Sequence, residues 1–384
     1  MDAKEFTSTA AGVLVENLEG RLAFRPHPLY PALILTPDIQ SSLSALTVNL
    51  GRLDAMVVAL PDPKILIRSF VRREAQLSSY IENTYANYVQ LARVEAAEAE
   101  LSPEVIEAYN AERALLAGID AVLRQGRPIF NSLIRQLQEV LLTHVRGHET
   151  RGRYRTKQVY IGNAQLGPAG ARFVPPPAHM VEELMEAFEA SWHAGGEHFA
   201  LVRLAMLHYQ FETIHPFEDG NGRVGRMLTL LGLCSFGFLR QPALNPSLHF
   251  ERHRRAYYDC LQRVSTMGDW LGWIAFFLEG LHVATEEAID KLRELLDLQK
   301  QYRLLIKSAR NAPQLMMLVD HLFISPEITV NEAASVMGVS QPAAHLSVKR
   351  LLSLNILRIS SSGRPMRYVA ETILKAVNAE PTPR

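Results

Sequence analysis

A twelve-residue segment from His215 to Arg226 combines residue types that could bind and transfer a phosphate group. It reads His-Pro-Phe-Glu-Asp-Gly-Asn-Gly-Arg-Val-Gly-Arg. Gly220, Asn221 and Gly222 stand where a loop is expected to become a helix. Glycine lets a ligand approach the backbone closely there, and free N–H groups point outward beside the positive end of the helix. The segment therefore predicts an anion-binding turn.

The side chains around this turn supply the other groups that nucleotide chemistry needs. Arg223 and Arg226 are three residues apart, so one helix face can present both to the outer phosphates of a nucleotide. Asn221 could donate to the phosphate nearest the reaction, and Asp219 could hold a magnesium ion. His215 could accept a proton from a hydroxyl group at neutral pH. A plain turn between core helices is the alternative, but these groups occurring together favour a nucleotide site.

The segment resembles the signature of the Fic/Doc family, which is histidine, any residue, phenylalanine, any residue, Asp or Glu, Gly-Asn-Gly-Arg, two residues and arginine. All eight specified positions are filled. The resemblance implies a protein adenylyltransferase, in which His215 deprotonates a target Ser, Thr or Tyr hydroxyl that attacks the α-phosphate of ATP and expels pyrophosphate. It implies Asp219 as the Mg²⁺ ligand and these ATP-binding residues: Gly220, Asn221, Gly222, Arg223, Val224, Gly225 and Arg226.

The segment Ser78-Ser-Tyr-Ile-Glu-Asn83 is similar to the inhibitory motif of the same family, which is Ser or Thr, three residues, Glu, and then Gly or Asn. Ser78 and Glu82 are one helical turn apart, and we expect a helix that begins near Ser78 and is capped by it. In the family this glutamate pairs with the second motif arginine, here Arg226, and prevents productive binding of ATP. A helix cap followed by a surface glutamate is the alternative.

Two further segments extend the resemblance. The stretch 152–162 with 173–176 resembles the family's flap, a hairpin that binds the target by adding a strand to it, although an ordinary surface hairpin would have the same pattern. Asn163 stands where a glycine is expected, which affects the flap geometry. Tyr257 and Tyr258 resemble the position of an aromatic residue near adenine, with core packing as the alternative. The flap residues expected to meet the target are Val159, Tyr160, Ile161 and Gly162.

Hydrophobic periodicity predicts a mainly α fold around these motifs. We expect an irregular or short-helix entry over residues 1–62 and a hairpin over 151–177. The helices are expected as two successive ones over 63–97, a charged pair over 104–145, and single helices over 180–193, 197–211, from the glycine turn to 233, 251–264 and 270–298.

The tail from 309 to 377 has the pattern of a winged helix-turn-helix. It contains a helix over 328–338, a turn capped by Ser340, a helix over 343–354, and strands over 356–359 and 366–369 around a wing at 361–364. The resemblance adds a known arrangement of bacterial members. We therefore expect an amino-terminal helical region carrying the inhibitory motif (1–110), a Fic-type helical core with a small flap (111–300) and a winged helix-turn-helix domain (301–384).

Composition restricts the partners and the compartment. Forty basic residues balance forty acidic ones, which disfavours a strongly electropositive nucleic-acid binder. Cys234 and Cys260 are too few for a disulfide framework or a four-cysteine zinc site, which fits a reducing cytoplasm. The amino terminus lacks the pattern of a secretory signal, and the apolar run 227–239 is shorter than the roughly 18 residues of a spanning helix. We expect a cytoplasmic protein without a membrane partner.

Two other functions use the same residues. A DNA-binding regulator could sense nucleotide through the core, but the expected recognition helix carries only Lys349 and Arg350, with Arg358, Arg364 and Arg367 near the wing. A protein-docking or dimer-supporting role is preferred for the tail, and DNA stays open. A hydrolase could remove AMP from a modified protein, with Glu82 orienting water. Forward transfer to target proteins and to the chain itself is favoured because the nucleotide set is complete.

Overall fold

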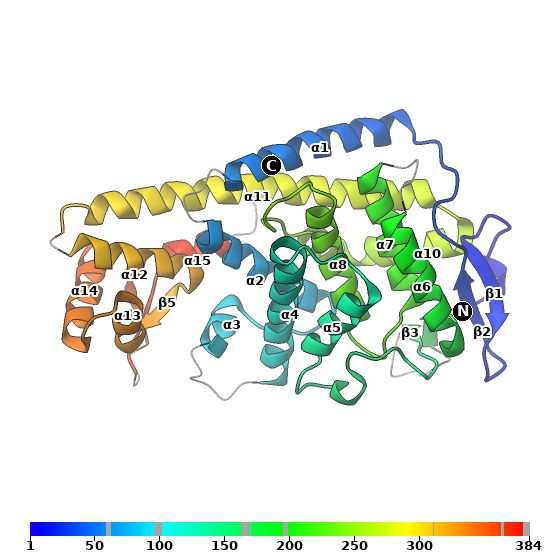
Figure 1. Ribbon diagram of the computed structural model, residues 1–384, viewed down its shortest axis with the longest axis horizontal. Helices are drawn as coiled ribbons and strands as arrows, with labels where there is room; N and C mark the ends of the chain where they lie inside the picture. Colours follow the sequence, from blue (N-terminus) through cyan, green and yellow to red (C-terminus); the bar gives the residue numbers. More distant parts are fainter. Residues whose placement is uncertain are drawn as a thin grey trace.

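The chain folds into a mainly helical structure with three small antiparallel sheets in the part that the structure describes (Figure 1). This computed structural model describes residues 1–58, 63–95, 102–162, 168, 170–194, 199–309, 311–361 and 365–378. One hydrophobic core runs from helix α1 near the amino terminus to helix α15 near the carboxyl terminus. None of the helices in these ranges is long and apolar enough to cross a membrane.

The central helices place the loop that carries the His215 segment. Helix α7 (Ala200–Ile214) leads into this loop, and α8 (Asn221–Ser235) leaves it and packs against α7. Helices α4 (Pro103–Ile119), α5 (Asn131–Leu141) and α6 (Val181–His193) surround this pair, followed by α9 (Ser247–Arg252), α10 (Arg254–Met267) and α11 (Trp270–Ile306). These helices confirm those predicted over 104–145 and 180–298, although α11 is longer and the region 251–264 is divided between α9 and α10.

The amino-terminal region is more regular than the sequence suggested. It forms a hairpin of strands β1 (Gly12–Glu16) and β2 (Leu22–Pro26), followed by the 22-residue helix α1 (Pro37–Val58). Figure 1 shows α1 running alongside α11, against which it packs. The expectation of an irregular entry was wrong because α1 carries a buried apolar stripe at helical spacing, which its proline-rich flanks masked: Leu43, Leu46, Leu50, Leu53 and Val57.

The inhibitory motif lies at the end of a helix and not at the start of one. Helix α2 (Pro63–Ile81) runs through Ser78, and the next helix, α3 (Tyr88–Glu95), begins after a short connection. Ser79 lies within the helix, and its hydroxyl donates to the Ala75 carbonyl at 2.8 Å, one turn earlier. Asn83 follows with a φ of 59°, a left-handed conformation that ends a helix and that asparagine tolerates. Two successive helices are therefore present, but the predicted break and the Ser78 cap were wrong.

A buried ion pair fixes α2 against its neighbours. Arg72 donates to both carboxylate oxygens of Glu112 on α4, at 2.9 and 3.1 Å, and neither side chain is exposed. The same guanidinium donates to the carbonyl of Ile324, at the end of helix α12. Removing one partner of such a pair leaves a buried charge uncompensated. The end of α2 that carries Glu82 is thus held by contacts to both halves of the chain.

The predicted flap hairpin is present but short. Strands β3 (Ile161–Gly162) and β4 (Ala171–Phe173) pair in antiparallel register, while 163–167, including Asn163 and Gly167, and 169 lie outside the described residues. Gly162 has a φ of 150°, and a Cβ there would collide with the Gly170 carbonyl. The amino-terminal hairpin borders the flap, because Tyr160 donates to Glu19 at 2.6 Å. Phe24 N also donates to Val174 O, and the rings of Phe24 and Phe173 lie 5.6 Å apart.

The carboxy-terminal elements contain the two helices and two strands expected there, with additions. In order they are α12 (Ala312–Ile324), β5 (Glu327–Thr329), α13 (Val330–Met337), α14 (Gln341–Ser353), β6 (Arg358–Ser361), β7 (Arg367–Val369) and α15 (Glu371–Asn378). The strand order is β5-β7-β6, and α12, β5 and α15 were not predicted. Thr329 caps α13 through a capping box, whereas Ser340 precedes α14 without a side-chain capping hydrogen bond. Residues 362–364 of the expected wing, including Arg364, lie outside the described residues.

Candidate active site

His215 is held in a strained, fully defined position at the end of α7. Its φ of 51° and ψ of 61° are left-handed, and its carbonyl accepts from Arg155 Nε at 2.8 Å. The ring Nδ1 lies 3.2 Å from the carbonyl of Glu212. Because a carbonyl can only accept, Nδ1 carries the proton and Nε2 carries the lone pair. Burial lowers the pKa of His215 to about 4, so the imidazole is neutral, and a base, at pH 7.

The loop after His215 is pinned by its own side chains. Phe217 is fully buried and anchors the loop in the core. The Asn221 side chain accepts from Phe217 N at 2.8 Å and donates to Phe217 O at 2.9 Å. These two bonds hold the loop, and a contact of the Asn221 amide with a phosphate stays a prediction. Gly220 precedes α8 with a φ of 85°, which leaves the first turn of the helix open.

The first turn of α8 faces the carboxylate of Glu82. A Cβ at Gly222 would collide with Glu82 Oε1, so the absence of a side chain at this position makes room for the carboxylate. Glu82 Oε1 accepts from Arg226 NH2 at 2.7 Å. The ion pair between the inhibitory motif and the second motif arginine is thus present. A carboxylate occupies the place where the sequence predicts an anion.

Three protein acceptors occupy the Nε and NH2 edge of Arg226. Its side chain is only 1% exposed. Besides its ion pair with Glu82, its Nε donates to Ser78 Oγ and its NH2 to Ser78 O, both at 2.9 Å. Burial opposes ionisation of Glu82, but Arg226 and then Arg223 outweigh it and keep the pKa of the Glu82 carboxyl below its ordinary value. The Glu82 side chain is itself 34% exposed, so a partly exposed, charged carboxylate lies on a buried, charged guanidinium.

Asp219 and Arg223 form a second group of charges beside the first. Asp219 accepts from Gly220 N at 2.6 Å and from Arg146 NH2 at 3.1 Å, and Arg223 NH2 lies 3.4 Å from it. The described residues contain no cluster of three or more acidic, histidine or cysteine ligands for a metal. A single carboxylate fits Mg²⁺, which proteins often hold by one or two carboxylates together with substrate phosphates and water.

Two motif positions serve helix packing. Val224 is fully buried in the core, and a Cβ at Gly225 would collide with Glu212 Oε1. The side of α8 that carries them therefore faces α7 and not the loop. The expectation that Val224 and Gly225 contact ATP is corrected on this ground.

The two adjacent tyrosines have different environments. Tyr257 is 1% exposed and its hydroxyl is 2.8 Å from His208 Nε2, so it is a core residue and not a neighbour of adenine as expected. Tyr258 is half-buried, and Arg254 lies over its ring at 5.9 Å. Arg254 also donates to Asn83 Oδ1 at 2.7 Å. Tyr258 thus lies beside the end of the inhibitory motif and remains a candidate.

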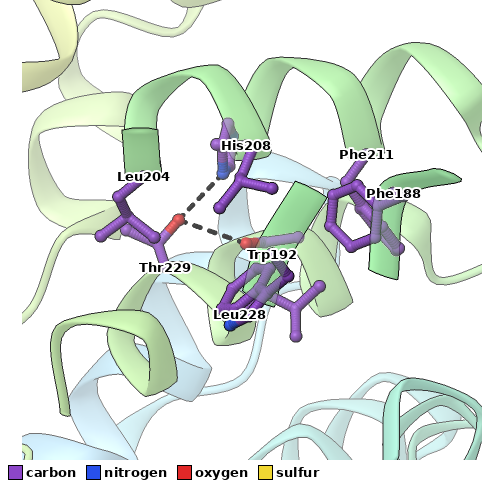
Figure 2. Close-up of a pocket in the computed structure, with 9 residues that line it drawn as sticks. Phe188, Trp192, Leu204, His208, Phe211, Leu228 and Thr229 are labelled. Atoms are coloured by element: carbon purple, nitrogen blue, oxygen red, sulfur yellow. Dashed lines mark hydrogen bonds between the residues drawn. The ribbon is translucent and has the colours of Figure 1, made fainter. Parts of the chain in front are cut away.

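The cluster around His208 is packing and not a ligand site. Figure 2 shows His208 bonded to Thr229 between the apolar side chains of α6, α7 and α8, at a distance of 2.9 Å between Nδ1 and Oγ1. The space that these residues line has no room for a water molecule. Burial lowers the pKa of His208 to about 3, so the ring stays neutral. His208 is therefore no candidate for the reactive histidine, and His215 remains the candidate.

Comparison with known proteins identifies the architecture. Residues 129–233 match the model of the Fic/DOC family. Residues 41–120 match the model of the Fic/DOC family N-terminal region. A Fic family protein from Desulfovibrio desulfuricans G20 superposes over 92% of this chain and all of its own, with a TM-score of 0.59 at 22% identity. This chain has the Fic fold. Fic-1 from C. elegans covers 67% of this chain with a TM-score of 0.53 at 20% identity.

Curated relatives of the Fic family agree with this assignment. The protein adenylyltransferase Fic of Culex quinquefasciatus is 27% identical over 313 residues, which are 73% of this chain and 57% of the relative. The protein of the same name from Drosophila virilis is 31% identical over 225 residues, which are 57% of this chain and 42% of the relative. The chain thus spans about half the length of the curated relatives that it matches.

Some residues around the Fic site were not singled out from the sequence. Arg155 bonds to the carbonyls of His215 and Pro176, and Arg146 reaches Asp219. Glu107 of α4 pairs with Arg223 at 3.1 Å. The contacts of Arg155 with His215, of Arg146 with Asp219 and of Glu107 with Arg223 join positions that are 60, 73 and 116 residues apart. The local sequence around a basic residue in a loop, or around an acidic residue on a helix, contains no pattern that would predict such long-range contacts.

Proposed function

We propose that the chain is a protein adenylyltransferase that transfers AMP from ATP to Ser, Thr or Tyr hydroxyls of target proteins and of itself, and that Glu82 inhibits it. The names of the Fic relatives support this activity. The observation that carries the proposal is the Glu82 carboxylate at the first turn of α8, paired with Arg226. A site that holds a carboxylate in this way, on a guanidinium that is only 1% exposed, has the charge and the donors to hold a phosphate.

The reaction follows from the groups in place. His215 Nε2 takes the proton of the incoming hydroxyl, whose oxygen forms a bond to the α-phosphorus of ATP. The bond from that phosphorus to the bridging oxygen breaks, and pyrophosphate leaves with the electron pair. Backbone N–H groups at the start of α8 hold the α-phosphate, and Arg223 and Arg226 hold the outer phosphates. Mg²⁺ on Asp219 would neutralise part of the phosphate charge.

The flap supplies the docking strand in this proposal. Strand β3 pairs on one side with β4. Its other edge could pair with an extended target segment, which would bring a hydroxyl towards His215 with specificity given by side chains such as Tyr160 and Ile161. We also propose that the elements from 301 onward form a winged helix-turn-helix that docks a protein. The exposed Leu346 on α14 favours protein over DNA.

The transfer of AMP is tested with labelled ATP. Purified Glu82→Gly protein, incubated with magnesium and ATP, should gain label from α-phosphate-labelled ATP and none from γ-labelled ATP. Intact-mass spectrometry should show the gain of one AMP. Label from the γ-position would indicate phosphorylation instead, and no label in either case, with ATP bound, would contradict the transferase assignment.

The pH dependence of transfer tests His215 as the base. Only the neutral imidazole can take a proton, and burial lowers the pKa of His215 from 6.5 to about 4. Glu82 acts in the opposite direction on this pKa, so its removal does not raise it. We expect kcat/KM of Glu82→Gly to hold from pH 7 down to about 5 and to fall towards pH 4. Circular dichroism at each pH excludes unfolding. A fall centred at 6.5 or above would contradict the assignment.

Hydrolysis of AMP from a modified protein is a second candidate. Glu82 lies close enough to His215 for each to shift the pKa of the other. A carboxylate in that place could orient a water molecule. If wild-type protein releases AMP from an AMP-labelled target faster than Glu82→Gly does, hydrolysis is the cellular direction.

A further inference from the structure

Arg223 and Arg226 are both buried, but their donors are used differently. Arg226 has its Nε on Ser78 and its NH2 on Ser78 and Glu82. Arg223 is 2% exposed, and its Nε is buried without a hydrogen-bond partner among the residues that the structure describes. An unsatisfied buried donor on a charged group costs free energy and calls for an acceptor. The two arginines therefore differ in whether an edge of the guanidinium is available.

Glu107 determines which edge of Arg223 is available. Its Oε2 accepts from Arg223 NH1 at 3.1 Å, and its own side chain is 15% exposed. The guanidinium is a planar fork of five N–H donors, so a carboxylate on NH1 leaves the edge formed by Nε and NH2. Among the residues that the structure describes, only Asp219 approaches that edge, with Oδ1 3.4 Å from NH2, which is long for a hydrogen bond.

Glu107 is itself held from the connection that follows α2. Thr84 donates its hydroxyl to the same Oε2 at 3.3 Å. Glu107 lies on α4, which packs against α8, so it approaches Arg223 from outside the twelve-residue segment and from outside the inhibitory motif. The carboxylate thus has two donors and a fixed helix behind it.

We propose that Glu107 is a positioning residue that holds Arg223 by NH1 and presents its Nε and NH2 edge to the β-phosphate of the nucleotide. This inference rests on the proposed function, since it concerns the same nucleotide site. If Asp219 binds Mg²⁺, Glu107 would be the carboxylate that remains beside Arg223. Without it the buried guanidinium would have no charged partner and would lose its orientation. Glu82 occupies a donor of Arg226, whereas Glu107 keeps the Nε and NH2 edge of Arg223 available to a ligand.

The experiment measures the preference for ADP over AMP, because the two nucleotides differ by the β-phosphate. Dissociation constants for both are determined by calorimetry with magnesium, in the Glu82→Gly background. We expect Glu107→Gln to lower the ratio of the AMP constant to the ADP constant about tenfold, as for the loss of one charge-assisted hydrogen bond. In a background that also carries Arg223→Gln, Glu107→Gln should have no further effect on this ratio.

Two more variants keep the test decisive. Glu104→Gln, an exposed glutamate on the same helix, should leave the ratio unchanged. Thr84→Val removes the hydroxyl donor to Glu107 and should lower the ratio by a smaller factor, which decides the matter if Glu107→Gln does not fold.

The outcomes separate this inference from the proposed function. A ratio unchanged by Glu107→Gln and by Thr84→Val, in protein that binds ATP, overturns the positioning role alone. A higher ratio overturns it too, because Glu107 would then compete with phosphate. Equal weakening of ADP and AMP would show a merely structural role. Failure of Glu82→Gly to bind ATP at all removes the proposed function, and the inference falls with it.

Discussion

Replacement of His215 should abolish transfer while leaving ATP binding intact. In the Glu82→Gly background, we expect a fall in kcat of about 10²- to 10⁴-fold, the range for loss of a general base. The reason is local, since His215 Nε2 is the free ring nitrogen and Nδ1 is committed to Glu212. Calorimetry with Mg-ATP should give a dissociation constant close to that of the parent protein.

The choice of substitution at this position matters. His215 has a φ of 51°, which alanine adopts only at a cost. His215→Asn keeps the left-handed backbone more readily and removes the base, so it should match His215→Ala in activity with less loss of stability. His345→Ala on α14, an exposed histidine, is the control. Substantial transfer by the asparagine variant would show that another group takes the proton.

Removal of the Glu82 carboxylate should have the opposite effect. We expect Glu82→Gly to bind Mg-ATP about ten to a hundred times more tightly than the wild type and to label itself, because the γ-phosphate no longer competes for Arg226 with a carboxylate at 2.7 Å. The size corresponds to one charge-assisted hydrogen bond, discounted because the Glu82 side chain is 34% exposed. Glu82→Gln should lie between the two.

The effect of Glu82→Gly on the melting temperature should change sign when ATP is added. Without nucleotide, Glu82→Gly leaves Arg226 buried with only the acceptors of Ser78, so its melting temperature should be lower than that of the wild type. With Mg-ATP, binding to the folded state should raise it more than in the wild type. Calorimetric melting of both proteins with and without ATP measures this. Equal shifts would contradict inhibition by Glu82.

The sequence predicted the parts of the site that are local. The anion turn lies within twelve residues, so its backbone and its helix start were readable from glycine positions alone. The pairing of Glu82 with Arg226, 144 residues apart, came from the resemblance to a family and not from spacing. Glu107 and Arg155 had no such guide, since only the packed helices bring them to the site.

The errors have a common physical origin. Asn221 was expected beside a nucleotide through its amide, and Tyr257 through its aromatic ring near adenine. In the structure the Asn221 amide bonds to Phe217, and Tyr257 is buried with its hydroxyl bonded to His208. A polar group can satisfy its hydrogen bonds inside the protein as well as on a ligand. Ser78 was expected to cap a helix because Ser78 and Ser79 interrupt the apolar periodicity, whereas the Ser78 hydroxyl accepts a hydrogen bond from Arg226 from within a helix.

Helix α11 gives the molecule a fixed span. Its 37 residues correspond to a rod of about 56 Å. One end packs on α7 and α10 beside the catalytic helices, the other on α12, and α1 reinforces its flank. This helix fixes the distance between the carboxy-terminal elements and the flap. In the proposed docking role, a partner bound at the far end of α11 would therefore present to the His215 imidazole only a hydroxyl that lies at the corresponding distance along that partner.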